Sequence, residues 1–357
     1  MSAERQNTKH VRHLSDGREI IYFDDEPGRV HQDDTRELPA IDSTSELRRD
    51  PTTGELVIIA SHRQARTHLP AREACPLCPS SEHERTEIPD ATYDVVVFEN
   101  RFPSLSTGTQ PAAGRSEVVC YSPQHEASLA TCELRRIATV VDAWCDRTTE
   151  LGRILGVRYV FVFENRGEEI GVTLSHPHGQ IYAYPFIPPM VDKMIAAATA
   201  HRASHHRSLF ADVVAAETAA ERVVLASDHW IGFVPEAARW PVEVHIYPRR
   251  QIASIDELTV DERLDFAREY QSLLGRLGSL FDRQLPYIAA WYQAPVTPAD
   301  HGLQPDDWWA HLRLMSIRRG PNKIKYLAGS ESAMGVFIND IAPETMAEMI
   351  NAVVPSS

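Results

Sequence analysis

The sequence predicts an α+β protein made of two similar halves, each with antiparallel sheet and one long helix. Short runs rich in β-branched and aromatic residues outnumber the helical segments, and short loops join them. Helical periodicity is sustained at about 133–151 and at about 259–278, once in each half. The order of elements in the first half recurs in the second, which favours a duplicated chain.

The first half is expected to span residues 47–200, after a polar segment. Residues 1–46 carry scattered charge and no apolar pattern, so they predict a flexible N-terminal arm. A turn at 52–54 then introduces the first strand, at 55–60. Further strands are expected at 94–98, 117–121, 159–163 and from residue 176 onwards, with the helix at 133–151 among them.

The second half is expected to span residues 201–357. The pattern Glu-Val-x-x-Tyr at 117–121 recurs at 243–247, and the pair Glu-Leu at 133–134 recurs at 257–258. These matches are short, but the shared order of elements supports them. The strands of this half are expected at 229–233, 243–247, 287–291 and 311–315, around the helix at 259–278.

Composition narrows the function classes. The chain has 36 basic and 50 acidic residues, and its formal net charge of -14 argues against nucleic-acid binding. No apolar run is long enough to span a bilayer, and the first residues lack the apolar region of a secretory signal. We therefore expect a cytoplasmic protein without a membrane partner, whose anionic substrates would need local arginines.

The strongest chemical signal is the run Ser-His-Pro-His-Gly-Gln at 175–180. Side chains alternate along a strand, so His176, His178 and Gln180 are expected on one face. An imidazole attacks phosphorus when one ring nitrogen is deprotonated and the other is fixed by an acceptor. Gln180 binds a phosphoryl oxygen but cannot protonate a leaving group, which favours transfer to a second phosphate over hydrolysis. The competing interpretation is a pair of ordinary surface histidines.

A second signal is Cys75-Pro-Leu-Cys78, which offers two thiolates to a metal. Tetrahedral zinc needs two further nitrogen or sulfur ligands, and His125 and His176 are the candidates. Zinc suits this donor set better than a redox metal, although iron remains an alternative. Without the histidines, a redox pair or two loop thiols would be the competing interpretation.

The run Phe-Glu-Asn-Arg-Gly at 163–167, Gly171 and the run His-Pro-His-Gly-Gln at 176–180 together resemble galactose-1-phosphate uridylyltransferase, a branch of the histidine triad superfamily. The resemblance extends from about residue 48 to about residue 344. It implies duplicated histidine-triad-like halves and a ping-pong exchange. UDP-glucose would uridylylate the nucleophile His178 and release glucose 1-phosphate, and galactose 1-phosphate would then take the UMP, with Gln180 steadying the transferred group.

The resemblance also implies the metal content. The family's structural zinc site uses a cysteine pair, a histidine after a Ser-Pro step and the first histidine of the run, and this sequence has all four ligands. A second metal site of some relatives uses one Glu and three His, of which only one is retained here. We therefore predict one structural zinc and no second metal. The zinc ligands would be Cys75, Cys78, His125 and His176; the second-site positions hold Met194, Tyr292, His311 and Arg313.

Substrate-binding residues are likewise implied by the resemblance. Two arginines would meet the nucleotide phosphates, one segment would contact uridine, and a third group would line the phosphate and sugar. Arg101 stands where some relatives have Asp. The residues are Arg63 and Arg66 for the phosphates, Asn100 and Phe102 for uridine, and Asn165, Gly171 and Thr173 for the phosphate and sugar.

A C-terminal segment resembles the family's sugar-recognition segment, in which a Lys, an aromatic residue and a Glu approach the hexose phosphate. The matching residues are Lys325, Tyr326 and Glu331. In the family this segment comes from the partner subunit, so the resemblance implies a homodimer with shared active sites. The substrates would be a nucleotide sugar and a sugar phosphate.

Two other functions stay open at this point. One is the same histidine chemistry with an adenine nucleotide, in which phosphate accepts AMP from ADP-glucose or a dinucleoside polyphosphate. The other is a catalytically inactive, zinc-stabilised nucleotide-binding protein. The presence of both His178 and Gln180 weighs against the inactive protein.

Overall fold

The structure is a computed structural model, and it describes residues 8–39, 45–65, 68–106, 113–281 and 284–353. The chain forms two compact units. Unit 1 contains Met1–Val162 and Thr173–Pro189, and unit 2 contains Phe163–Val172 and Met190–Ser357. Each unit combines antiparallel strands with helices, so the predicted α+β class and antiparallel pairing are confirmed.

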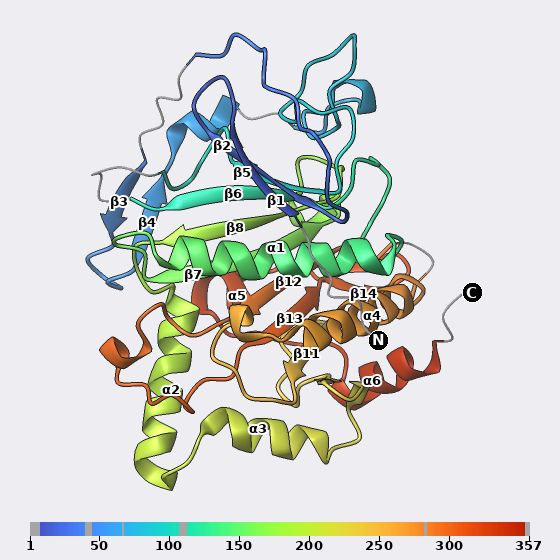
Figure 1. The fold of residues 1–357 in the computed structure, drawn as a ribbon. Helices are drawn as coiled ribbons and strands as arrows, with labels where there is room; N and C mark the ends of the chain where they lie inside the picture. Colours follow the sequence, from blue (N-terminus) through green and yellow to red (C-terminus); the bar gives the residue numbers. More distant parts are fainter. Residues whose placement is uncertain (1–7, 40–44, 66–67, 107–112, 282–283, 354–357) are drawn as a thin grey trace. The chain divides into compact units, whose positions relative to one another are not determined.

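Unit 1 is built on an antiparallel sheet with the strand order β1-β2-β5-β6-β8 (Figure 1). A separate hairpin pairs β3 with β4. Strand β7 (Tyr159–Arg166) leads the chain from unit 1 into unit 2. The strands are β1 (Thr8–His13), β2 (Glu19–Asp24), β3 (Glu46–Arg49), β4 (Leu56–Ile59), β5 (Val95–Glu99), β6 (Arg115–Cys120) and β8 (His178–Tyr184).

The N-terminal segment differs from the flexible arm that the sequence predicts for residues 1–46. Strands β1 and β2 form a hairpin, and β2 pairs with β5 inside the sheet. Residues Ile20, Ile21, Tyr22 and Phe23 are buried, whereas most of β1 is exposed. The polar composition of this segment did not predict the hairpin. Many of its charged side chains form ion pairs with residues distant in the sequence instead of being solvated by water.

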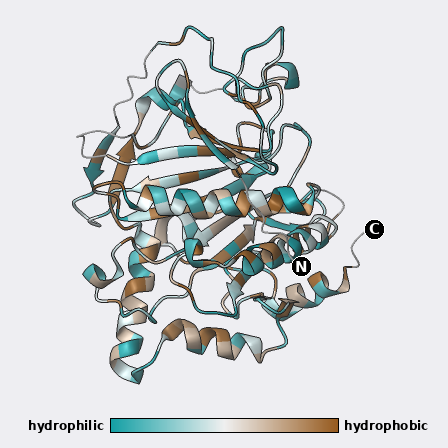
Figure 2. Ribbon diagram, in the orientation of Figure 1, coloured by the Kyte–Doolittle hydropathy of each residue, from teal (hydrophilic) through white to brown (hydrophobic). Residues whose placement is uncertain are grey.

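Helix α1 (Leu134–Gly152) packs against the sheet of unit 1, contacting β2, β5 and β8 (Figure 1). Its buried side chains include Ile137, Val141, Trp144 and Leu151, which recur at helical spacing. Figure 2 shows hydrophobic and hydrophilic residues alternating along this helix, as one buried and one solvated face require. The helix predicted at about 133–151 is confirmed.

The large strands of unit 2 pair in the antiparallel order β7-β12-β13-β11-β10-β9. The part of β7 from Phe163 onwards pairs with β12. Two small strands, β14 (Arg318–Gly320) and β15 (Lys323–Ile324), pair separately. The remaining strands are β9 (Val223–Ala226), β10 (Trp230–Phe233), β11 (Val242–Pro248), β12 (Tyr287–Tyr292) and β13 (His311–Ser316).

The long helix of unit 2 is α4 (Val260–Gly278), close to the predicted 259–278. Its first turn is closed by Thr259, whose hydroxyl accepts a hydrogen bond from the Glu262 amide while the Glu262 side chain accepts one from the Thr259 amide. A cap of this kind contributes about 1 kcal/mol to helix stability. The other helices are α2 (Pro189–His205), α3 (Leu209–Thr218), α5 (Gly329–Met334) and α6 (Pro343–Ala352).

The division of the chain also differs from the halves that the sequence predicts. The units separate within β7 and again at residues 189–190, not at residue 200. Helix α2, with 17 residues, is a further long helix that the sequence analysis did not predict. Among the residues that the structure describes, no helix has the length and apolar character needed to cross a membrane.

Candidate functional site

Strand β8 carries the predicted nucleophile. Along it, His178, Gln180, Tyr182 and Tyr184 are partly accessible while the residues between them are buried, so His178 and Gln180 share one face as predicted. Cys120 pairs with His178 in the adjacent strand. The strand begins at His178, however, and His176 precedes it. His176 lies beside the cysteine pair rather than on the accessible face with His178.

The imidazole of His178 is oriented by the backbone. Its Nδ1 lies 2.7 Å from the carbonyl oxygen of His176, to which it donates a hydrogen bond. Burial lowers the pKa of His178, and this keeps the ring neutral near neutral pH. In a neutral ring with a proton on Nδ1, Nε2 carries the lone pair. The site therefore presents a nucleophilic nitrogen.

A cavity of about 190 Å³ lies in front of β8, and all of its lining residues belong to unit 1. It contains His178 and Gln180 together with four of the predicted binding residues. The structure therefore brings together His178, Gln180, Arg63, Asn100, Phe102 and Thr173. Arg66 lies outside the described residues.

The loop at 100–104 forms one wall of this cavity and is held by internal hydrogen bonds. The Asn100 side-chain oxygen accepts from the Phe102 amide at 2.8 Å, and the Asn100 amide donates to the Ser116 carbonyl at 2.8 Å. Arg63 donates from one guanidinium nitrogen to the Phe102 carbonyl and to the Ser104 hydroxyl. Part of the Arg63 guanidinium is therefore used to fix the loop, in addition to any role with phosphate.

Glu87 and Arg101 also line the cavity, and sequence reasoning assigned a role to neither. The Glu87 carboxylate is buried and receives hydrogen bonds from Arg18 and Arg36, and Arg101 lies 3.5 Å from one of its oxygens. Arg18 and Arg36 come from the segment that the sequence predicts to be a flexible arm. No local spacing links these residues, so only the fold reveals that they meet.

The other predicted binding residues lie in unit 2. Asn165 is on β7, opposite Ile288, and Gly171 ends a short turn with a φ of +84° that a side chain would strain. Lys325 is buried, donating to Glu331 at 2.9 Å and to the Ile338 carbonyl, while Tyr326 is 77% exposed. None of these residues lines the cavity of unit 1.

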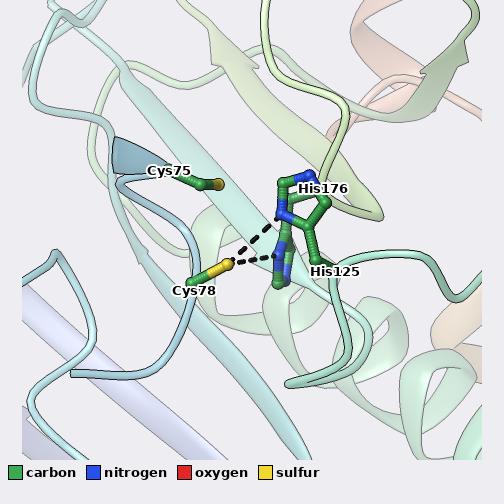
Figure 3. A group of neighbouring side chains, drawn as sticks. All are labelled: Cys75, Cys78, His125 and His176. Carbon is green, nitrogen blue, oxygen red and sulfur yellow. Dashed lines mark hydrogen bonds between the residues drawn. The ribbon is translucent and has the colours of Figure 1, made fainter. Parts of the chain in front are cut away.

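Four side chains gather as a candidate metal centre, as the sequence predicts: Cys75, Cys78, His125 and His176 (Figure 3). One ligand atom from each lies within 4.8 Å of all the others. The Cys78 sulfur is 3.3 Å from His125 Nδ1 and 3.6 Å from His176 Nδ1. Around tetrahedral zinc, sulfur and nitrogen ligands are separated by about 3.5 Å, so the spacing fits a metal.

The surroundings of the two histidines also suit metal ligation. The far nitrogen of His176 donates to the Ser122 carbonyl at 2.9 Å, and that of His125 lies 3.0 Å from the Ser175 hydroxyl. Such partners fix the ring so that Nδ1 faces a metal. Burial, followed by the charge of Cys75, raises the pKa of Cys78 to about 12. A bound cation would favour the thiolate, so the donor set fits a divalent metal.

The residues predicted to replace a second metal site lie in unit 2. Arg313 donates to His311 Nε2 at 3.0 Å, and its guanidinium carbon lies 4.3 Å from the centre of the Tyr292 ring. Another of its nitrogens is 3.7 Å from the Met194 sulfur. The positive charge of Arg313 therefore lies among these four residues, where it would disfavour a metal cation. The absence of a metal there stays a prediction.

The fold and the site define a transferase of the histidine-triad type. The sequence models of the galactose-1-phosphate uridyl transferase N-terminal and C-terminal domains match residues 107–188 and 195–354. The chain belongs to the galactose-1-phosphate uridylyltransferase family. The galactose-1-phosphate uridylyltransferase of Streptomyces lividans is 42% identical, covering 95% of this chain and 96% of that protein.

Other relatives agree. The galactose-1-phosphate uridylyltransferase of Thermotoga maritima is 34% identical over 85% of this chain and 97% of its own length. A solved uridylyltransferase structure superposes with a TM-score of 0.74 and 31% identity, over 86% of this chain and 97% of that one. An ADP-glucose phosphorylase from Arabidopsis thaliana shares the fold, with a TM-score of 0.68, 23% identity, and coverage of 87% of this chain and 100% of that one.

Proposed function

We propose that this protein transfers UMP between UDP-glucose and galactose 1-phosphate through a uridylyl-His178 intermediate. The observation that carries the proposal is the His178 ring, held by the His176 carbonyl and lining a cavity with Gln180. Membership of the uridylyltransferase family supports the choice of substrates.

The chemistry proceeds in two displacements. His178 Nε2 attacks the α-phosphorus of UDP-glucose, a phosphorus–nitrogen bond forms, and the bond to the β-phosphate oxygen breaks to release glucose 1-phosphate. A phosphate oxygen of galactose 1-phosphate then attacks the same phosphorus and the phosphorus–nitrogen bond breaks. The Nδ1 hydrogen bond to the His176 carbonyl stabilises the positive charge that develops on the ring.

Gln180 would hold the transferring group without supplying a proton. The Tyr182 hydroxyl donates to the Gln180 side-chain oxygen at 3.2 Å. Because this bond occupies the side-chain oxygen, the amide nitrogen is the group available to donate to a phosphoryl oxygen. In the first displacement glucose 1-phosphate departs as an anion, and in the second the His178 ring departs as a neutral imidazole, so neither displacement requires a general acid.

We assign one structural zinc to Cys75, Cys78, His125 and His176. When bound, the metal would supply a fixed cross-link between the cysteine loop and the residue that precedes β8. The His176 side chain belongs to this cluster, and its carbonyl oxygen accepts the His178 hydrogen bond. Metal analysis of protein after exhaustive buffer exchange should find about one zinc per chain.

The phosphates and uridine would be bound by Arg63, Arg66, Asn100 and Phe102, and the phosphate and sugar by Asn165, Gly171 and Thr173. We further propose a homodimer in which the partner subunit supplies Lys325, Tyr326 and Glu331 to the sugar. The segment around them exposes a group of large apolar side chains, which suits an interface between copies. These are Tyr326, Leu327, Met334, Val336 and Ile338. Five cysteines without disulfide partners suit the reducing cytoplasm, where we place the enzyme.

The test is to trap the intermediate. Protein is incubated with UDP-glucose labelled either in the uridine or in the glucose, and acid-labile, base-stable label on the protein is counted. We expect label from uridine alone, at one site, and none in His178→Asn with metal retained. Label from ADP-glucose but not from UDP-glucose would support the adenylyl-transferring alternative, and no label from either would support an inactive nucleotide-binding protein.

A further inference from the structure

A second group of metal-ligating side chains lies in unit 1 and shares no residue with the cavity or with the Cys/His cluster. It consists of His10 on β1, Asp24 at the end of β2 and His31 in the segment that follows. One ligand atom from each lies within 4.8 Å of the other two.

The register of the β1–β2 hairpin produces this group. Thr8 pairs with Asp24 and His10 pairs with Tyr22, so His10 and Asp24 are diagonal neighbours on one face. The His31 ring stacks on Tyr22, with 3.8 Å between centroids and 12° between planes. The hairpin and the following segment therefore converge at the Asp24 carboxylate.

The spacing of the ligand atoms matches a coordination sphere. One Asp24 oxygen lies 2.9 Å from His31 Nε2 and 3.6 Å from His10 Nε2. Around a tetrahedral ion with bonds of about 2.0–2.2 Å, nitrogen and oxygen ligands are separated by about 3.4 Å. The Cys/His cluster shows a comparable spread, with 3.3 and 3.6 Å between sulfur and nitrogen.

The neighbours of these residues favour ligation. The His31 Nδ1 lies 3.0 Å from an Asp90 oxygen, and the other Asp90 oxygen accepts from the Gln32 amide at 2.9 Å. A histidine that donates to a carboxylate in this way presents its second nitrogen to a metal. His10 Nε2 and the remaining Asp24 oxygen are buried without a hydrogen-bond partner. Arg29 lies 3.4 Å from that oxygen, but it also pairs with Asp94.

We propose that His10, Asp24 and His31 form a binding site for a divalent transition-metal ion, with water completing the coordination. The His10 side chain is 35% exposed and Asp24 is fully buried, so an ion would enter from the side of His10. The ion would fasten the hairpin to the segment that carries Arg36, the partner of the cavity residue Glu87. The competing explanation is a metal-free His31 ring hydrogen-bonded between Asp24 and Asp90.

Titration with Co²⁺ separates the two explanations. Full-length protein without a histidine tag is used, with its Cys/His cluster already loaded with zinc. We expect one further equivalent of Co²⁺ to bind, with visible d–d absorption and no thiolate-to-metal charge-transfer band in the near ultraviolet. The same additions should raise the melting temperature in proportion to occupancy.

Matched variants on one strand supply the control. His10→Ala should weaken Co²⁺ binding by about 10–100-fold, whereas His13→Ala, on the exposed opposite face of β1, should bind like the wild type. Asp24→Asn should resemble His10→Ala. No further equivalent in the wild type, or equal affinity in the His10 and His13 variants, would overturn the proposal. The far-ultraviolet circular dichroism spectrum checks that each variant is folded, so the proposal stands or falls separately from the transferase function.

Discussion

Strands β8 and β13 carry the same local geometry and differ in one decisive contact. In β8, His178 Nδ1 lies 2.7 Å from the carbonyl oxygen two residues earlier, and in β13 His311 Nδ1 lies 2.8 Å from the Trp309 carbonyl. Two residues further on stand Gln180 and Arg313. The Gln180 side chain leaves His178 Nε2 facing a cavity, whereas Arg313 donates to His311 Nε2 at 3.0 Å.

The surroundings of the two rings reinforce this difference. The His311 ring is fully buried and stacks against Tyr247, with 4.4 Å between centroids, and against Tyr292, with 5.5 Å. Burial, followed by the charge of Arg313, holds the pKa of His311 well below its usual value. The comparison teaches that a fixed imidazole is not sufficient for this chemistry. Its second nitrogen must also face space that a phosphate can fill.

The largest expected effect separates the two histidines. His178→Asn should lower transferase activity by about 10⁴-fold or more, because the nucleophile is lost. His311→Asn should keep the labelled intermediate and instead lower the free energy of unfolding by about 1–3 kcal/mol, because a partly buried Arg313 donor loses its acceptor. Activity assays with denaturant unfolding test both. Loss of label in the His311 variant would break the comparison.

The second prediction concerns a substitution that would give β8 the arginine–histidine contact found in β13. In Gln180→Arg, the guanidinium should donate to His178 Nε2 and occupy its lone pair, lowering kcat by about 10²–10³-fold. The zinc content should be unchanged, since position 180 belongs to no metal cluster. Gln180→Ala is the matched control, which removes the amide without blocking the ring and should be impaired less. If the two variants lose equal activity, ring blockage is not the cause.

A third prediction concerns the Cys/His cluster beside β8, which includes the residue that orients His178. Cys78→Ser should lose zinc and reduce kcat by about 10–100-fold, because the His176 carbonyl that orients His178 is no longer held by the cluster. Cys132→Ser, a cysteine outside the cluster, should keep both. Zinc content and pre-steady-state uridylylation are measured together. A zinc-free variant with full kcat would contradict the coupling.

The smallest expected effect concerns Glu164, on the part of β7 that belongs to unit 2. Complete burial raises the pKa of Glu164 to about 7. Its folded pKa therefore exceeds the unfolded value, so this group favours folding below about pH 4.5 and loses that contribution as the pH rises through 7. Glu164→Gln should flatten this fall and stabilise the protein at pH 8 by about 1–3 kcal/mol. Urea unfolding at pH 5 and pH 8 measures the difference, and parallel curves would refute it.

The sequence was informative where chemistry is encoded in neighbouring residues. The run at 175–180 and the pair Cys75 and Cys78 have fixed spacings, and the structure places them at the start of β8 and in a four-residue cluster. The two long helices followed from apolar periodicity alone. The pairing of His125 with the cysteines required the resemblance as well as the donor types.

The rest depends on contacts between distant segments. Composition marked residues 1–46 as an arm, yet within them four consecutive buried residues place β2 in the sheet. Glu87 is 69 residues from Arg18 and 51 residues from Arg36 in the sequence. Only the fold brings these side chains within hydrogen-bonding distance. His176 was expected to share a face with His178, but the strand begins two residues later, at His178, and the His176 side chain lies beside the cysteines.

The double attachment of His176 has a consequence for the physiology of the enzyme. One residue gives its ring to the Cys/His cluster and its backbone oxygen to the His178 ring, so a change in metal occupancy would reach that ring through His176 and one hydrogen bond. Catalytic rate would then report on metal supply. With zinc bound there as proposed, a cell starved of zinc would slow the proposed UMP transfer even while the protein itself remained abundant.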